Sequence, residues 1–187
     1  MVAVDLPVLV AKAGHPVLEF CNTRAGWADP VPHEYLTSYA HLAEWARRHD
    51  LPTALSDAGG AAVLDRALAF RSALYAVLAG TSRPSDWAAV NAEVRRAAGA
   101  AELVPSAGVL PAVPRLPDSL GAELPLLAVV RACAELLVSP QADKVGVCPG
   151  VGCGWLFVNP HGKRRWCTMA ICGNRAKARR HAARVRA

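Results

Sequence analysis

Hydrophobic side chains recur at intervals of three and four residues through residues 34–100, which is the pattern of amphipathic helices packed on a core. The first helical segment, 33–50, ends before Pro52, and the second covers residues 56–80. A third opens at Pro84, because Pro, Ser and Asp are typical of the first turn of a helix. Three helices of this kind can enclose a hydrophobic core.

The pattern changes in two later segments and in one earlier one. Residues 101–119 are rich in Pro and Val around a Ser-Ala-Gly turn, which predicts a short hairpin whose strands lie at an edge. Residues 121–139 are almost entirely apolar apart from three charged side chains within roughly 120° of arc, so we expect the most buried helix there. The apolar run at 17–21, VLEFC, resembles a short strand.

Charge divides the chain of 187 residues into two unlike parts. Residues 1–147 carry 12 Lys and Arg against 15 Asp and Glu, a net charge of −3, whereas residues 148–187 carry nine Lys and Arg and no acidic residue, a net charge of +9. A concentrated basic end is typical of a polyanion-binding segment or of a solvated tail. We therefore predict a helical domain over 1–143 and a small basic module over 144–187, with the boundary in residues 139–144.

Neither the N-terminal segment nor the most apolar stretch of the chain predicts export or a membrane span. Asp5 precedes any Lys or Arg, which differs from a secretory signal, and the apolar stretch 124–138 is too short and too charged to span a bilayer. We therefore expect a cytoplasmic protein without a membrane partner. In a reducing compartment, cysteines are more often metal ligands or catalysts than disulfides.

Four cysteines form two pairs, each with four intervening residues. They are Cys148, Cys153, Cys167 and Cys172. Zinc prefers four such ligands in a tetrahedron at about 2.3 Å, so the spacing predicts one structural Zn²⁺ per chain rather than four incidental thiols. A closed four-thiolate site leaves no position for water, which argues against a catalytic zinc. Cys21 and Cys133 lie alone in apolar surroundings and are interpreted as core residues.

The segment between the two cysteine pairs predicts a hairpin. Residues 154–167 alternate between apolar and polar on either side of an Asn-Pro-His-Gly turn at 159–162. Trp155, Phe157 and Trp166 can shield the metal from water, and the Pro and Gly residues at 149–152 allow a tight turn that directs amide hydrogens towards sulfur. The predicted fold is therefore mainly α with small β elements (α+β), ending in a treble-clef-like zinc module of β-hairpin and helix.

The terminal helix is expected to begin near Cys172 and is basic on two sides, so it has little apolar surface to bury. Phosphates along both walls of a DNA major groove would explain that composition, and a solvated tail is the alternative. The candidate nucleic-acid-binding residues are Lys163, Arg164, Arg165, Asn174, Arg175, Lys177, Arg179, Arg180, Arg184 and Arg186.

Two stretches resemble a known pair of families. RRWCTMAICGNRAKARRHAAR and CGWLFVN resemble the CGNR zinc finger, which is named after the string at residues 172–175, and LEFCNTRAGW is similar to the start of the ABATE domain. ABATE domains precede this finger in bacterial proteins described as stress-induced transcription regulators. The resemblance covers essentially the whole chain and implies a zinc-binding, DNA-binding regulator whose four paired cysteines occupy the family's ligand positions.

In the N-terminal domain, Asn22, Thr23 and Arg24 follow the apolar run, and Arg71 lies in the apolar stripe of a helix. A guanidinium drawn towards a core must be paired, either with a carboxylate such as Asp65 or Glu19, which we favour, or with a small anionic effector held by these four residues. No catalytic triad, His pair, phosphate-binding loop or nucleotide motif is present, so we do not expect an enzyme.

The expected partners are duplex DNA, the small anionic effector and, as an option, a second copy in a homodimer. Two other functions stay open. The zinc module could bind RNA or the ribosome, since zinc knuckles with basic helices serve RNA as well. The basic end could instead solubilise a structural zinc domain.

Overall fold

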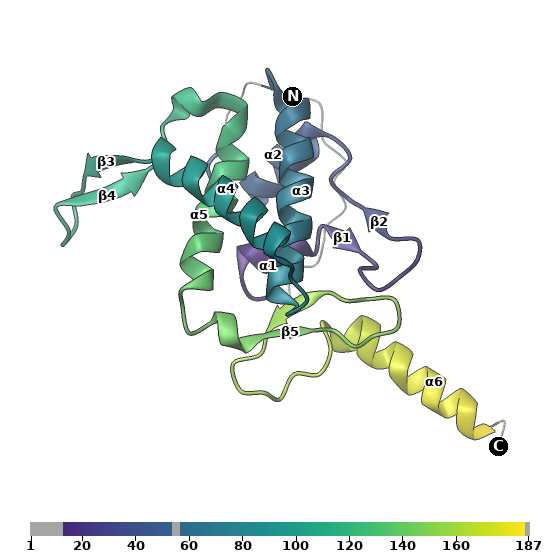
Figure 1. Cartoon of the computed structure of the whole chain (residues 1–187). Coiled ribbons are helices and arrows are strands. Elements are labelled where there is room, and N and C mark those ends of the chain that lie inside the picture. Colours follow the sequence, from purple (N-terminus) through teal and green to yellow (C-terminus); the bar gives the residue numbers. More distant parts are fainter. Residues whose placement is uncertain (1–12, 54–56, 186–187) are drawn as a thin grey trace.

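The computed structural model describes residues 13–53 and 57–185 (Figure 1). Helices dominate the first part and short antiparallel strand pairs connect them. In chain order, the first elements are α1 (Pro16–Cys21), β1 (Arg24–Ala25), β2 (His33–Glu34), α2 (Tyr39–Arg48), α3 (Gly60–Leu78), α4 (Pro84–Ala100), β3 (Glu102–Pro105) and β4 (Ala112–Arg115). They are followed by η1 (Asp118–Glu123), α5 (Leu124–Leu137), η2 (Ala142–Lys144), β5 (Val145–Val147), β6 (Leu156–Val158), η3 (Met169–Gly173) and α6 (Asn174–Val185).

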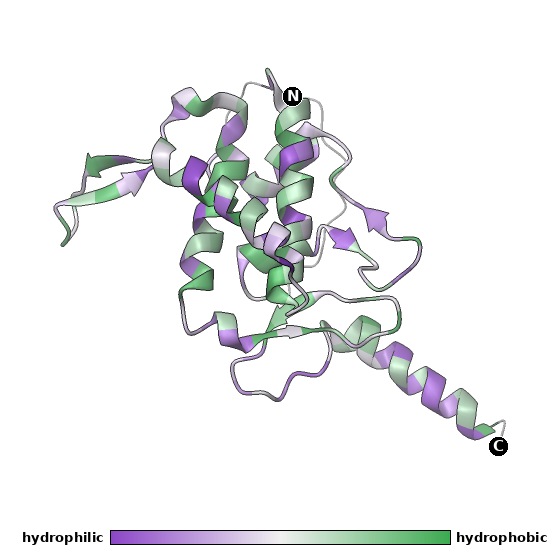
Figure 2. Ribbon diagram, in the orientation of Figure 1, coloured by the Kyte–Doolittle hydropathy of each residue, from purple (hydrophilic) through white to green (hydrophobic). Residues whose placement is uncertain are grey.

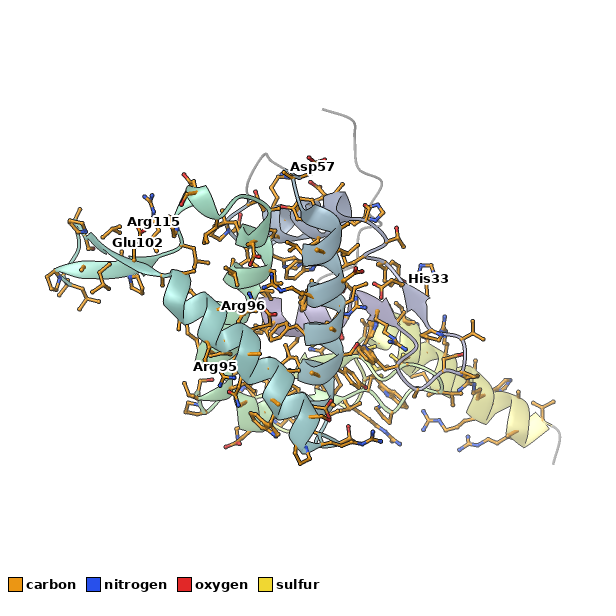
Figure 3. The ribbon with its side chains drawn as sticks, turned by 45° about the horizontal axis from the view of Figure 1, so that its top comes forward. His33, Asp57, Arg95, Arg96, Glu102 and Arg115 are labelled. Atoms are coloured by element: carbon orange, nitrogen blue, oxygen red, sulfur yellow. The ribbon has the colours of Figure 1, made fainter. Side chains whose placement is uncertain are left out.

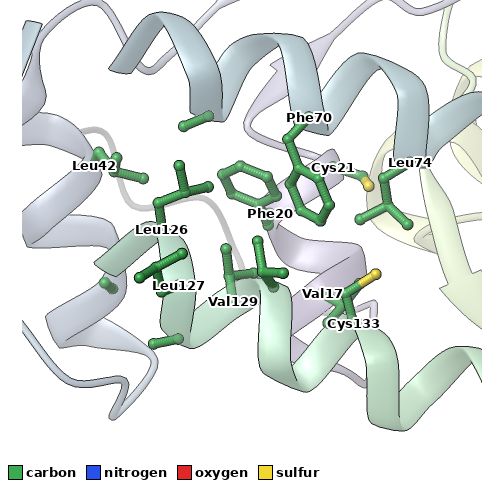
Figure 4. Close-up of a cluster of buried hydrophobic side chains, with 14 of the residues drawn as sticks. Val17, Phe20, Cys21, Leu42, Phe70, Leu74, Leu126, Leu127, Val129 and Cys133 are labelled. Carbon is green, nitrogen blue, oxygen red and sulfur yellow. The ribbon is translucent and has the colours of Figure 1, made fainter. Parts of the chain in front are cut away.

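Phe20 of α1 lies at the centre of the hydrophobic core. Its ring centroid is 5.2 Å from that of Trp45 in α2 and 6.2 Å from that of Phe70 in α3, and side chains of α5 such as Leu126 complete the cluster (Figure 4). Helix α5 has nine buried residues among its 14, whereas α3 has seven among 19. Helix α5 is therefore more buried than α3, as expected, although the short helix α1 has five of its six residues buried.

Two predicted segments differ from the structure near the N-terminus. The run at 17–21, predicted as a strand, belongs to helix α1, because Pro16 starts the helix and the side chain of His15 accepts a hydrogen bond from the Val17 N–H. The segment 33–50 is helical only from Tyr39, where Ser38 caps the first turn; its first two residues are strand β2 instead. The start predicted for the next helix at residue 56 lies outside the described residues.

The predicted hairpin at 101–119 is confirmed as β3 and β4. It forms an arm that projects from the helices (Figure 1), with Leu103 paired to Pro114. Glu102 and Arg115 pair at its base, on the side of the molecule away from α6 (Figure 3). Arg131 of α5 donates a hydrogen bond to the Pro114 carbonyl oxygen at 3.0 Å, which attaches the base of the arm to the helices.

The hairpin of the zinc module pairs differently from the prediction. Strand β6 pairs with β5, so that Val145 lies opposite Val158 and the hairpin encloses the first cysteine pair rather than the turn at 159–162. The predicted partner strand is absent because the Asn159 side chain makes both hydrogen bonds to the Arg164 backbone, at 2.9 Å each, in place of a strand ladder.

The zinc module is joined to the helices by buried hydrogen bonds. The side chain of Asn22, at the end of α1, donates to the Leu156 carbonyl and accepts from the Leu156 N–H, both at 2.9 Å. The Tyr75 hydroxyl of α3 donates to the Gly154 carbonyl at 2.7 Å, and the Trp27 N–H donates to the Cys153 carbonyl at 3.1 Å. Figure 2 shows β6 as a hydrophobic strand beneath the helices, and its Leu156 belongs to their core. Leu156 and Val158 of β6 therefore extend the helical core, whereas Phe157 and three of the cysteines form a second buried cluster.

We expect Asn22→Ala to lower the free energy of unfolding by about 3 kcal/mol, because it leaves the buried N–H and C=O of Leu156 without partners. The measurement is urea unfolding of the zinc-loaded protein. Asn174→Ala is the matched control, since Asn174 is exposed and makes one weak bond of 3.3 Å. Equal losses in the two variants would contradict the importance of this connection.

Candidate metal centre and nucleic-acid interface

Four cysteine sulfurs converge at one point of the zinc module. The Sγ atoms of Cys148, Cys153, Cys167 and Cys172 all lie within 4.8 Å of one another. Two of these separations are 3.7 Å, between Cys153 and Cys167, and 3.6 Å, between Cys167 and Cys172. A tetrahedral ion with sulfur ligands at about 2.3 Å requires sulfurs about 3.8 Å apart, so the four thiols fit zinc.

Backbone geometry keeps the first cysteine pair close to the second. Backbone groups of Cys167 and Gly150 help to lower the pKa of the Cys148 thiol. A Cβ atom at Gly150 would lie 2.8 Å from the Cys172 Sγ, which is closer than such atoms approach. Only glycine at this position lets the two turns meet.

The thiols are electrostatically coupled in the absence of a metal. Hydrogen bonds from Cys153 and Cys167 lower the pKa of Cys148 to about 2. The same hydrogen bonds to Cys148 raise the pKa of Cys153 to about 12 and also raise the pKa of Cys167. The cluster thus favours negative charge on one sulfur and holds protons on its neighbours. A divalent cation replaces those protons, because a coordinated thiol is deprotonated.

Apolar side chains and one arginine enclose the cluster. Phe157 is buried beside it, and Trp155 and Trp166 pack against it, as the sequence predicts. The Arg164 guanidinium lies 4.5 Å from the Phe157 ring centroid and donates to the carbonyl oxygens of Trp166 and Cys167. Arg164 therefore helps to hold the zinc module together, and its predicted contact with nucleic acid stays an untested prediction.

The Cys-Gly-Asn-Arg string at 172–175 has a separate structural role for each residue. Cys172 belongs to the sulfur cluster, and Gly173 leaves room for the Met169 side chain, whose sulfur would lie 2.5 Å from an added Cβ. Asn174 donates to the Ala170 carbonyl at 3.3 Å and begins α6. Arg175 is exposed on the first turn of α6.

Helix α6 extends from the zinc module away from the rest of the chain (Figure 1), and none of its described residues is buried. The exposed candidates for nucleic-acid binding on it are Asn174, Arg175, Lys177, Arg179, Arg180 and Arg184, and Lys163 and Arg165 are exposed on the preceding loop. Arg186 lies outside the described residues. A groove of about 270 Å³ runs between the first cysteine turn and α6, and Arg165, Arg175, Arg179 and Arg180 line it.

The four residues predicted to hold an effector lie close to one another, and each of them contacts other groups of the protein. They are Asn22, Thr23, Arg24 and Arg71. Arg71 is 1% exposed and pairs with both carboxylate oxygens of Glu34, and its Nη1 atom is 2.7 Å from the Thr23 hydroxyl. The structural pairing that we favoured is therefore present, with Glu34 as the partner instead of Asp65 or Glu19. The Arg24 guanidinium lies 4.7 Å from the Trp27 ring centroid. Effector binding by these four residues stays an untested prediction.

Sequence reasoning missed the residues that connect the two parts. Trp27 stacks on Tyr75 with ring centroids 3.7 Å apart, and both bind the backbone of residues 153–154. Tyr75 follows Arg71 by one helical turn, so a second polar group on the apolar stripe of α3 was the available signal. Cys21 and Cys133 are buried as expected, and burial raises the pKa of Cys133 to about 12.

Comparison with protein families agrees with this arrangement. Residues 14–140, more than half of the chain, match the ABATE family, described as "putative stress-induced transcription regulator". The chain belongs to the ABATE family. The CGNR zinc finger matches residues 144–185, directly after the ABATE region. Together with the sulfur geometry, this match identifies one structural zinc ion held by the CGNR finger of this ABATE protein.

Neither of the two matched families is an enzyme family. Both matched families are of regulator and zinc-finger types rather than enzymes. A search of curated proteins found no match. Among the described residues, no helix has the length and apolar character needed to cross a membrane.

Metal analysis of the protein purified without added zinc should return about one zinc per chain. We expect Cys172→Ser to release the zinc, because one thiolate is lost from a site whose binding energy supports folding. Cys133→Ala is the control: Cys133 is a buried cysteine outside the cluster, so that variant should keep its zinc. Full zinc occupancy in Cys172→Ser would contradict the assigned ligands.

Proposed function

We propose that this protein is a transcription regulator that binds duplex DNA through α6, with the zinc module as the rigid support of that helix. The observation that carries the proposal is the charge of α6, which has five Lys and Arg and no acidic residue. In the described part of the chain, none of these five side chains forms an ion pair. A polyanion would relieve their mutual repulsion.

The groove beside α6 supports contact with a nucleic-acid backbone. Four guanidinium groups line it, and guanidinium is the side-chain group best suited to bidentate binding of phosphate. Arg165 lies over Trp166 with a distance of 5.1 Å to the ring centroid, which keeps its charge at the groove rim. Asn174 and Arg175, at the start of the helix, are our candidates for contacts with base edges.

In this proposal the chain works in two parts. Residues 144–187 bind DNA, and residues 1–143 hold the zinc module through Asn22, Trp27 and Tyr75. Since these contacts reach the turn that carries Cys153, a change in the helical part can alter the orientation of α6. That connection suits a regulator whose DNA affinity depends on a signal received elsewhere in the chain.

The test is the salt dependence of binding to duplex DNA. If Arg179 and Arg180 neutralise phosphates, replacing both with Ala should weaken binding to all sequences and reduce the slope of log affinity against log salt by about two at most. Zinc content should not change, because neither residue is among the four cysteines of the cluster.

Arg95→Ala with Arg96→Ala is the matched control for this experiment. These adjacent arginines lie on α4, on another face of the molecule from α6 (Figure 3), and should leave the salt slope unchanged. Equal effects of the two double variants would contradict the role of α6. Structured RNA that displaced duplex DNA at fixed salt would favour the RNA-binding alternative, and the absence of salt-dependent binding to either would favour a solubilising tail.

A further inference from the structure

The arm formed by β3 and β4 carries apolar side chains into solvent, away from the helices (Figure 1). Leu103 is 77% exposed and Leu110 is 63% exposed, and Val109 at the tip is fully exposed. A hairpin of two strands is marginally stable in water by itself and gains stability from packing against another element. The exposed apolar side chains of the arm therefore indicate a surface that another molecule covers.

Prolines prevent the edges of the arm from adding further strands. The Ser106 N–H donates to the Pro111 carbonyl oxygen at 3.1 Å, and hydrogen-bonded pairs alternate with non-hydrogen-bonded pairs along an antiparallel ladder. Pro105 and Pro114 therefore occupy positions whose backbone groups face outwards. Since proline has no N–H, each outer edge keeps one donor among its four strand residues. A partner of the arm must bind chiefly through side chains.

A hollow of about 280 Å³ lies at the base of the arm, between β4 and α5. Apolar residues of its lining are Leu51, Pro52, Leu116, Ala128 and Ala132. The charged residues of the lining have neighbours of opposite charge in the same chain. Arg131 lies 3.6 Å from the Glu135 carboxylate, and Arg115 lies opposite Glu102 in the strand pair. The hollow is therefore suited to an apolar group without charge.

The tip of the arm has that character. Residues 103–114 contain no charged side chain, and Ser106 is their only polar residue. The absence of positive charge argues against a nucleic-acid partner, because phosphates are bound by cations. Val109 and Leu110 lie at the turn, whereas the hollow lies at the opposite end of the same hairpin. One chain therefore cannot cover its own tip with its own hollow.

We propose that two copies of this chain form a dimer through their arms, which lie side by side and antiparallel, so that the tip of each arm fills the hollow at the base of the other. A two-fold axis between identical antiparallel hairpins places each tip beside the partner's base, whatever the length of the arm. The contact is self-complementary and closes at two copies instead of continuing as a fibre.

The size of this contact is sufficient for a specific interface. The arm has 14 residues, and the lining of the hollow adds seven outside the arm. Together they reach the lower end of the about 20–30 residues that each partner contributes to a standard interface. The arm lies away from α6 (Figure 3), so both copies of α6 stay exposed in the dimer. Two such helices suit a duplex with two half-sites, although the dimer does not rest on the proposed DNA binding.

The dimer is tested by sedimentation of the zinc-loaded full chain over a range of protein concentrations. The chain should sediment as a reversible dimer, and Leu110→Glu should raise the dissociation constant about tenfold or more, because a leucine loses its apolar surroundings at two symmetric places. Val31→Glu is the matched control and should keep the dimer. Val31 is 82% exposed in the loop between β1 and β2 and belongs to neither the arm nor the hollow.

An exchange of charge tests whether the tip meets the hollow. Ala132→Lys changes the lining and should also weaken the dimer of its own copies. Mixing this variant with Leu110→Glu should restore a dimer of one copy of each. In that dimer the introduced carboxylate meets the introduced amine, and the second contact keeps both of its original residues. Circular dichroism and zinc content identify the variants that are folded.

Four outcomes would overturn the proposed interface: a chain that stays monomeric at all concentrations, a dimer that Leu110→Glu leaves intact, equal losses in Leu110→Glu and Val31→Glu, or no dimer on mixing the two folded variants. Binding of a monomer to phosphatidylcholine vesicles that is lost in Leu110→Glu would also overturn it and make a membrane the partner of the arm.

Discussion

Four thiolates that share one zinc ion are the interaction on which the arrangement of the C-terminal part depends. Their ligand geometry brings the turns at 148–153 and 167–172 together, and Gly150 permits an approach to Cys172 that a Cβ atom would obstruct. Helix α6 begins immediately after the last sulfur ligand, so its direction is set by the metal site. A helix with no buried residue cannot orient itself by packing, and here coordination does so.

The metal site is in turn attached to the helical core through backbone groups. Carbonyl oxygens of Cys153 and Gly154 accept hydrogen bonds from Trp27 and Tyr75, and Asn22 binds both polar groups of the Leu156 backbone. These contacts are buried or half-buried, where a lost partner is costly. Zinc, hairpin and helices are therefore one connected structure.

The features that could be predicted from sequence were those with a local physical cause. Periodicity located the helices, and cysteine spacing identified the sulfur cluster, because both depend on residues close in the chain. The segment at 17–21 failed because apolar runs of five residues suit a strand or a buried helix equally, and Pro16 was the weaker signal. The hairpin around 159–162 failed because the Asn159 side chain substitutes for a strand partner.

Contacts between distant residues were beyond sequence reasoning for a different reason. Glu34 was expected inside a helix, so it was not considered as the partner of Arg71, 37 residues away. The contact between Tyr75 and Gly154 spans 79 residues, and no local pattern encodes it. A cleft made by residues 25–35 and 151–175 likewise appears only in the folded chain.

Hydrogen exchange of backbone amides with zinc bound and after its removal tests most directly whether the metal, the hairpin and the helices form one connected structure. The contacts of Asn22, Trp27 and Tyr75 predict that zinc removal increases exchange in residues 22–36 and at the C-terminal end of α3, as well as in residues 145–185. An increase confined to residues 145–185 would contradict the account and make the zinc module an independent appendage.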